Sequence, residues 1–139
     1  LNIRTAKRSD AGLLMKHDKH INEREMLELL SFGRVYIAEK DGRSAGWLRY
    51  SMFWGNTPFM DMLYVLEEHR GRGIGTELVA FWEERMRGLG YETAMTSAVS
   101  DEYAQHLYYK LGYRAVGGFT PYGEPYELIL EKRLVTKHL

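Results

Sequence analysis

The chain of 139 residues contains no cysteine and only three prolines, at positions 58, 121 and 125. The missing thiol excludes a disulfide framework, a thiolate zinc site, an iron–sulfur cluster and a cysteine acyl-enzyme. It also fits a reducing compartment, and we expect a cytoplasmic protein. With so few prolines and no low-complexity tract, nothing marks a linker, so we expect a single domain over residues 1–139.

An excess of one charge sign and long apolar runs are also missing. The 19 Lys and Arg residues balance the 19 Asp and Glu residues, so the formal net charge is zero. A protein that coats nucleic acid or an anionic membrane carries a basic excess, so we expect neither partner. The apolar runs are short, which argues against a helix that spans a bilayer, and residues 1–10 lack the apolar core of a signal peptide.

What is present is an alternation of strand and helix patterns. Alternating or short apolar runs predict strands at residues 2–6, 35–39, 45–53, 59–66, 93–98, 113–119 and 126–132. Helical spacing predicts helices from Ser9 or Asp10 to His17, from Asn22 to Gly33, and over residues 75–87 and 101–111. The order βααβββαβαββ predicts an α/β (α+β) fold in which helices pack on the faces of a mixed sheet.

Polar residues at the helices predict two local features. Asn22 with Glu25 three residues later is typical of a helix N-cap, and Ser9 or Asp10 is expected to cap the first helix. The third helix carries a charged face, which we expect to be solvated and which is formed by Glu77, Glu83, Glu84, Arg85 and Arg87.

The most informative stretch is the glycine-rich turn between the strand at 59–66 and the following helix. Gly71, Gly73 and Gly75 allow the backbone to curl tightly and to approach a ligand. The first turn of a helix has unpaired N–H groups and favours an anion, and Arg70 and Arg72 add positive charge. The turn therefore predicts a site for a phosphate or pyrophosphate.

Two common phosphate motifs do not fit this turn. A P-loop requires a Lys after its last glycine, and none follows Gly75. In a dinucleotide-binding fingerprint the third glycine comes one residue later than Gly75 does. From the glycines alone, a helix start that binds nothing stays open as an alternative.

Two motifs together resemble the GNAT superfamily of N-acetyltransferases. Arg70-Gly-Arg-Gly-Ile-Gly75 matches the family's R/Q-x-x-G-x-G/A signature, and Leu107-Tyr-Tyr-Lys-Leu-Gly-Tyr113 resembles its later LY-x-K-x-G-F/Y motif. They stand in the family's order, separated by one helix and one strand. The resemblance implies a mixed, mostly antiparallel sheet of about seven strands that is splayed in the middle, with helices on both faces.

The resemblance also implies acetyl-CoA as the cosubstrate. In the family, backbone N–H groups of the turn hold the pyrophosphate, which corresponds here to Arg70, Gly71, Arg72, Gly73, Ile74, Gly75 and Thr76. The pantetheine arm pairs with the preceding strand at Leu63, Tyr64 and Val65, between strands 59–66 and 93–98. A backbone N–H of that strand polarises the acetyl carbonyl.

The tyrosine of the later motif typically protonates the departing CoA thiolate, which here is the role implied for Tyr108. A phenol of pKa about 10 can donate to a thiolate of pKa about 8–9 when the two are close and aligned. On periodicity alone Tyr108 also fits a core position, since it shares an apolar stripe with Leu107 and Leu111. The implied mechanism is direct attack of an amine on the thioester in a ternary complex, and the absence of cysteine removes the usual nucleophile of a two-step route.

Two positions depart from the family pattern. The family often has Asn seven residues before the tyrosine, where this chain has Asp101, and we include Asp101 among the cofactor contacts. A carboxylate there is unfavourable near phosphates unless it faces solvent or caps the helix, a role that Ser100 could take instead. Some members carry a Glu base twelve residues before the tyrosine, and Thr96 at this position is no base at neutral pH.

The general base is therefore open among Asp61, Glu127, His106, a chain of waters, or none. We favour Asp61, because it shares a strand face with Leu63 and Val65. Partial desolvation in such an apolar strand would raise its pKa towards a useful range. A hydrogen-bonded structural aspartate is the alternative, and no metal is expected.

The sequence thus predicts an acetyl-CoA-dependent N-acetyltransferase acting on a small-molecule or peptide amine. Polyamines, amino-sugar antibiotics, amino acids and protein N-termini all remain open as acceptors, as does a homodimer. The alternatives are an inactive acyl-CoA-binding or sensing module of the same fold, which Thr96 favours, and a binder of nucleotide phosphates.

Overall fold

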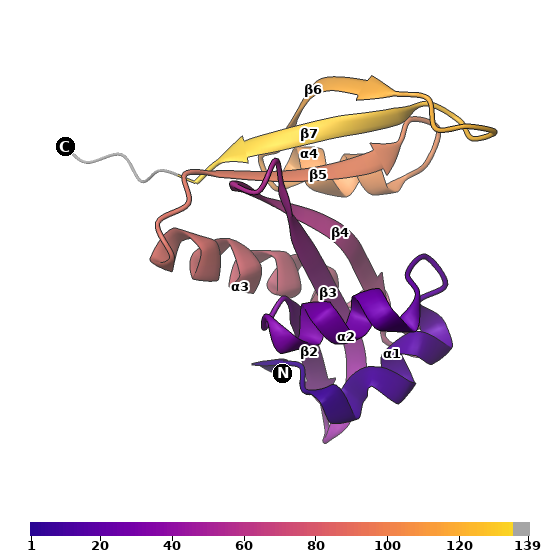
Figure 1. Cartoon of the computed structure of the whole chain (residues 1–139), viewed down its shortest axis with the longest axis vertical. Coiled ribbons are helices and arrows are strands. Elements are labelled where there is room, and N and C mark those ends of the chain that lie inside the picture. The colour runs from indigo at the N-terminus through magenta and orange to yellow at the C-terminus, as the bar shows by residue number, and fades with distance from the viewer. Residues whose placement is uncertain (135–139) are drawn as a thin grey trace. The chain divides into compact units, whose positions relative to one another are not determined.

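The computed structural model describes residues 1–134 and has the expected element order (Figure 1). Its strands are β1 (Asn2–Thr5), β2 (Val35–Lys40), β3 (Arg43–Phe53), β4 (Thr57–Val65), β5 (Thr93–Val99), β6 (Arg114–Phe119) and β7 (Glu127–Arg133). Its helices are α1 (Ala11–His17), α2 (Glu23–Ser31), α3 (Ile74–Gly88) and α4 (Ala104–Lys110), with short 3₁₀ turns η1 (Arg8–Asp10) and η2 (Glu67–His69).

The seven strands form one mixed sheet in the order β1-β2-β3-β4-β5-β7-β6, which confirms the predicted fold class. Strands β1, β2 and β3 pair antiparallel in sequence, as do β5 with β7 and β7 with β6. Strands β4 and β5 are parallel, with Phe59 opposite Met95 and Met60 opposite Thr96. A parallel pair needs a long crossover connection, and α3 forms it.

The chain groups into two compact units whose limits fall inside elements. Within the described residues, unit 1 contains residues 1–51 and 62–82, and unit 2 contains residues 52–61 and 83–134. The expected single domain and the expected splay of the central strands involve both units and stay predictions. Among residues 1–134, no helix combines the length and the apolar character that a membrane span requires.

One face of the unit 1 strands is covered by the first two helices. Side chains alternate along a strand, so Val35 and Ile37 of β2 lie on the same face as Trp47, which is opposite Ile37 on β3. These residues form one buried cluster with Leu14 of α1 and with Met26 and Leu30 of α2. Figure 1 shows α1 and α2 together over β2 and β3.

The opposite face of the same strands packs against α3. Tyr36 meets the ring of Phe81 edge to face at 5.1 Å between centroids, and Tyr50 lies 5.9 Å from Trp82. Tyr36, Tyr50 and Trp82 are buried. Unit 1 therefore has helices on both faces of its strands, as expected. The contacts of its aromatic residues determine the position of α3 on this face.

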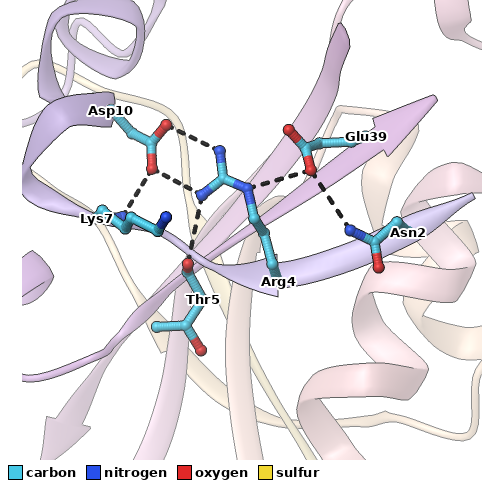
Figure 2. A network of polar contacts seen from close by, with 6 residues as sticks. All are labelled: Asn2, Arg4, Thr5, Lys7, Asp10 and Glu39. Carbon is cyan, nitrogen blue, oxygen red and sulfur yellow. Dashed lines mark hydrogen bonds and ion pairs between the residues drawn. The ribbon is translucent and has the colours of Figure 1, made fainter. Parts of the chain in front are cut away.

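The two predicted helix caps have different outcomes. Asn22 caps α2 as predicted, since its side-chain oxygen accepts the N–H of Glu25 at 2.9 Å. The predicted side-chain cap at α1 is wrong. Asp10 precedes this helix, but its carboxylate accepts two guanidinium N–H groups of Arg4, at 2.8 and 2.9 Å, and the backbone N–H of Lys7 at 2.7 Å (Figure 2).

The stronger charged partner explains why Asp10 does not cap. Hydrogen bonds to a guanidinium stabilise a carboxylate more than a bond to one neutral N–H. The bonds from Arg4 accordingly hold the pKa of Asp10 below its ordinary value. Arg4 also reaches Glu39 of β2 at 3.2 Å, so it joins β1, the start of α1 and β2 (Figure 2).

A second ion pair in unit 1 is buried and was not predicted from the sequence. Asp18, which ends α1, accepts Nε of Arg49 at 2.6 Å and Nη2 of the same side chain at 3.3 Å. One oxygen of Asp18 also accepts the N–H of His20 at 3.2 Å. This ion pair joins the segment between α1 and α2 to β3, on the face of the strands that these helices cover.

In unit 2, the expectation of a fully solvated charged face on α3 is wrong at Glu83. This residue is only 5% exposed, and its carboxylate accepts the hydroxyl of Tyr113 and Nζ of Lys132, both at 2.8 Å. The predicted pair with Arg87 is present at 3.8 Å. Glu83 thus anchors the last part of α3 to β7.

Removing Arg49 from its buried pair with Asp18 should lower the free energy of unfolding far more than removing Arg4. We expect Arg49→Ala to lower the free energy of unfolding by about 3–5 kcal/mol, because Asp18 remains buried without its counter-ion. We expect Arg4→Ala, whose ion pairs are partly exposed, to cost about 1 kcal/mol. Urea unfolding measures both, and equal losses would contradict this account of unit 1.

Candidate functional site

The glycine turn after β4 is built by two left-handed backbone positions. The chain passes through η2 and Arg70, and then Gly71 and Gly73 adopt φ values of +76° and +82°. An added Cβ at either glycine would meet no atom within 4 Å. Backbone conformation, not crowding, therefore requires glycine at both positions. The turn ends at Ile74, where α3 begins.

Gly75 has a different role from the two glycines before it. It lies in the first turn of α3, and an added Cβ would be 3.5 Å from Leu63 and 3.8 Å from Val65. These are ordinary contact distances, so the start of α3 lies against the end of β4 and a Cβ would fit between them.

The start of α3 presents N–H groups to a ligand. The N–H of Glu77 donates to the carbonyl of Gly73 at 3.0 Å, which leaves Ile74, Gly75 and Thr76 ahead of the first intrahelical bond. The helix dipole adds partial positive charge at the same end. Ile74 is buried, whereas Thr76 is exposed to solvent. This arrangement favours an anion.

The two arginines of the turn have separate surroundings. Arg70 donates Nε to the carbonyl of Val65 at 2.8 Å, and its guanidinium lies over the ring of Tyr64 at 5.5 Å. Arg72 is exposed. The side chain of Arg70 therefore holds the turn against the end of β4, and both Arg70 and Arg72 are exposed to solvent.

Sequence reasoning missed Gly46, which determines how closely β3 approaches the end of β4. A Cβ at this position would stand 2.6 Å from the carbonyl oxygen of Tyr64 and 3.2 Å from Cα of Val65. The N–H of Leu66 donates to Ala45 at 2.8 Å beside it. A glycine inside a β-rich run was the available signal, because it often marks a close backbone approach.

In unit 2, Tyr108 of α4 is buried against polar as well as apolar groups. Its ring meets that of Tyr113 at 6.0 Å, and its polar neighbours are Thr96 on β5 and Glu127 on β7. Burial raises the pKa of Tyr108 above the ordinary value, the contact with Thr96 partly opposes this, and the charge of Glu127 adds to it. The phenol is therefore protonated over the neutral pH range.

The three candidate bases differ in burial. Asp61 is exposed, so the desolvation expected at this position is wrong, because the strand is open to solvent there. His106 is also exposed, with its ring against Tyr103 and Tyr109. Glu127 is half-buried, and its charge acts on Tyr108. The base role itself stays a prediction for each of them.

Asp101 and Ser100 do not cap the helix that contains Tyr108. This helix begins three residues later than expected, at Ala104, and Tyr103 stands at its N-cap. The N–H of Ser100 donates to Tyr126 at 2.9 Å, which ties this residue to the segment before β7. Asp101 is exposed, so it meets the condition of facing solvent.

Comparisons with known proteins agree on one family. The model of the acetyltransferase (GNAT) family matches residues 6–113. An uncharacterized N-acetyltransferase of Methanocaldococcus jannaschii is 39% identical over 82 residues, which are 57% of this chain and 51% of that protein. The match thus spans about half the length of this relative.

Solved structures share the fold at low identity. The PaiA N-acetyltransferase of Thermoplasma acidophilum, in complex with coenzyme A, aligns with a TM-score of 0.80 and 16% identity, over 95% of this chain and 98% of that one. The ribosomal-protein-S18-alanine N-acetyltransferase of Escherichia coli aligns with a TM-score of 0.84 and 14% identity, over 99% and 96%.

Replacing a left-handed glycine of the turn with alanine should destabilise the protein, whereas the same replacement at a helical glycine should not. We expect Gly73→Ala to lower the free energy of unfolding by about 1 kcal/mol, because alanine disfavours a positive φ. Gly88→Ala is the matched control, since Gly88 is helical, has open space for a Cβ and should gain about 0.5–1 kcal/mol. A Gly73→Ala protein as stable as Gly88→Ala would contradict the assigned turn.

Proposed function

This chain belongs to the acetyltransferase (GNAT) family, and on that premise we propose that it transfers the acetyl group of acetyl-CoA to a primary amine. The observation that carries the proposal is the turn at 70–75. It combines two left-handed glycines, an exposed Arg72 and the N–H groups at the start of a fifteen-residue helix. These features together suit a pyrophosphate better than a single phosphate.

The residues of unit 1 fit the cosubstrate. Acetyl-CoA would supply an acetyl group activated as a thioester. The backbone from Arg70 to Thr76 would hold its pyrophosphate, and the end of β4 at Leu63, Tyr64 and Val65 would pair with the pantetheine arm. Asp101 remains a proposed contact, and its exposure lets water screen it from the phosphates.

Tyr108 is the proposed general acid. Two observations support this role: residues 107–113 resemble the family's later motif, and Tyr108 is buried in unit 2. As the C–N bond forms and the C–S bond breaks, Tyr108 gives its hydroxyl proton to the sulfur, and the proton lost by the amine restores the phenol through a base or water. The products are the amide and free CoA. Its raised pKa keeps the donor form present at neutral pH.

We propose two candidates for the general base, Asp61 and Glu127. Asp61 stays a candidate although its exposure removes the physical reason for favouring it. Glu127 has better support, because it is half-buried and its charge acts on Tyr108. The atom that loses a proton and the sulfur that gains one are bonded to the same carbon, so base and acid should act close together.

Substitution of Tyr108 tests the transfer chemistry. We expect Tyr108→Phe to lower kcat at saturating acetyl-CoA about 100-fold or more, which is the range of general acid catalysis. Tyr109→Phe is the matched control, because the neighbouring ring is exposed and should leave kcat unchanged. Since the chain has no cysteine, a thiol-reactive dye reports CoA release without background from the protein.

The substrates for this assay are a panel of polyamines, amino sugars, amino acids and peptides with free N-termini. An unchanged kcat in Tyr108→Phe would remove the acid role. Tight binding of acetyl-CoA without CoA release on any amine would overturn the transfer proposal in favour of an acyl-CoA-binding module.

A further inference from the structure

Arg70 is an exposed cation whose side chain is held by neutral groups. Its Nε donates to the carbonyl oxygen of Val65 at 2.8 Å, and its Cζ lies 5.5 Å from the centroid of the Tyr64 ring. Neither contact neutralises its charge. Within residues 1–134, its two Nη atoms form no hydrogen bond or ion pair. The guanidinium is therefore oriented in advance and still has donors for an anion.

Other arginines of the described chain are held in a different way. Their guanidinium groups donate to carboxylates, at distances from 2.6 to 3.5 Å, and these ion pairs are formed by Arg4, Arg49, Arg87, Arg114 and Arg133. A phosphate accepts the parallel N–H groups of a guanidinium in the same way as a carboxylate does. The anion that suits Arg70 is therefore a ligand and not an acidic side chain of residues 1–134.

The ring of Tyr64 is itself fixed by two other rings. It stacks on the indole of Trp47 at 4.7 Å between centroids, with 23° between the planes, and it lies 6.1 Å from the imidazole of His17. Trp47 has no exposed surface and belongs to the buried cluster of unit 1. Core packing thus determines where the Tyr64 ring stands, and the ring limits where the guanidinium of Arg70 can lie.

We propose that the side chain of Arg70 binds the pyrophosphate of acetyl-CoA and that Tyr64 is its positioning residue. This inference rests on the proposed function, in which the backbone of the turn holds the same group. A side chain that is already ordered loses fewer conformations when it binds a ligand. The aromatic contact therefore lowers the entropic cost of binding and leaves the charge of Arg70 for the phosphates.

Binding of acetyl-CoA to variants of the ring tests the positioning role. We expect Tyr64→Leu, which removes the ring, to raise the dissociation constant about two- to fivefold, the size of one exposed cation–π contact. Tyr64→Phe, which keeps the ring, should bind as the wild type does. Phe32→Leu is the matched control, because the ring of Phe32 lies under Arg34 at 5.1 Å in the same unit. Calorimetric titration measures all four proteins, and a Tyr64→Leu protein with wild-type affinity would overturn the role of Tyr64.

A truncated cosubstrate separates the positioning of Arg70 from a general effect on β4. S-Acetylpantetheine carries the thioester and the arm but no phosphate, so Tyr64→Leu should leave its dissociation constant unchanged. The variant Arg70→Ala/Tyr64→Leu should bind acetyl-CoA no more weakly than Arg70→Ala, because Tyr64 acts only through Arg70. Equal losses for the two cosubstrates, or additive losses in the double variant, would overturn the positioning role.

Ionic strength tests the charge contact. Arg70→Ala should raise the dissociation constant of acetyl-CoA by about tenfold or more, and this constant should depend less on salt than that of the wild type. Gly73→Ala disturbs the same turn without removing a charge, so it should keep the wild-type salt dependence. An Arg70→Ala protein with the wild-type salt dependence would overturn the contact. Acetyl-dephospho-CoA lacks the 3′-phosphate, and a loss that disappears with it would overturn the assignment to the pyrophosphate.

These binding measurements need no acceptor, which separates the two proposals. A wild-type protein that releases no CoA with any amine overturns acetyl transfer, while the losses in Tyr64→Leu and Arg70→Ala still establish the contact. An active protein in which Tyr64→Leu binds acetyl-CoA as the wild type does overturns the role of Tyr64 and leaves the transfer proposal intact. A wild-type protein that does not bind acetyl-CoA overturns both.

Discussion

The structure depends most on one sharp reversal of the chain, where β4 ends and α3 begins. Two positive φ values at Gly71 and Gly73 make the reversal, and the bond from Arg70 to the Val65 carbonyl fixes it against the strand. Everything proposed for unit 1 follows from this constraint. It places the unbonded N–H groups at the start of α3 beside the end of β4, and it directs the helix along the Tyr36 and Tyr50 face of the strands. The turn is therefore both a folding element and the candidate anion site.

Unit 2 depends on a different constraint, which is that its buried polar groups need hydrogen-bond partners. Glu83 accepts hydrogen bonds from Tyr113 and Lys132, and Thr96 donates one to the carbonyl of Met60. The first set joins α3 to β7 as a closed network. The second joins the neighbouring strands β4 and β5.

The features that could be predicted from the sequence are those that neighbouring residues determine. Periodicity predicted all eleven helices and strands in order, and the Asn22 cap and the glycine turn follow from neighbouring residues. The errors arose where distant residues decide the outcome. Glu83 looked solvated because its partner Lys132 stands 49 residues away, and Asp10 looked like a cap because the pairing with Arg4 depends on how β1 folds back. Asp61 looked desolvated because alternation along a strand does not reveal whether the face is covered.

The central claim is that backbone N–H groups of the turn bind the pyrophosphate of acetyl-CoA. Amide NMR of the ¹⁵N-labelled protein tests it most directly, with acetyl-CoA and ATP added in separate titrations. The account predicts that acetyl-CoA shifts the amide resonances of residues 70–76 and of Leu63 to Val65, and that ATP at the same concentration does not shift the strand residues. Perturbation of the turn by ATP but not by acetyl-CoA, or no perturbation by either, would contradict the account.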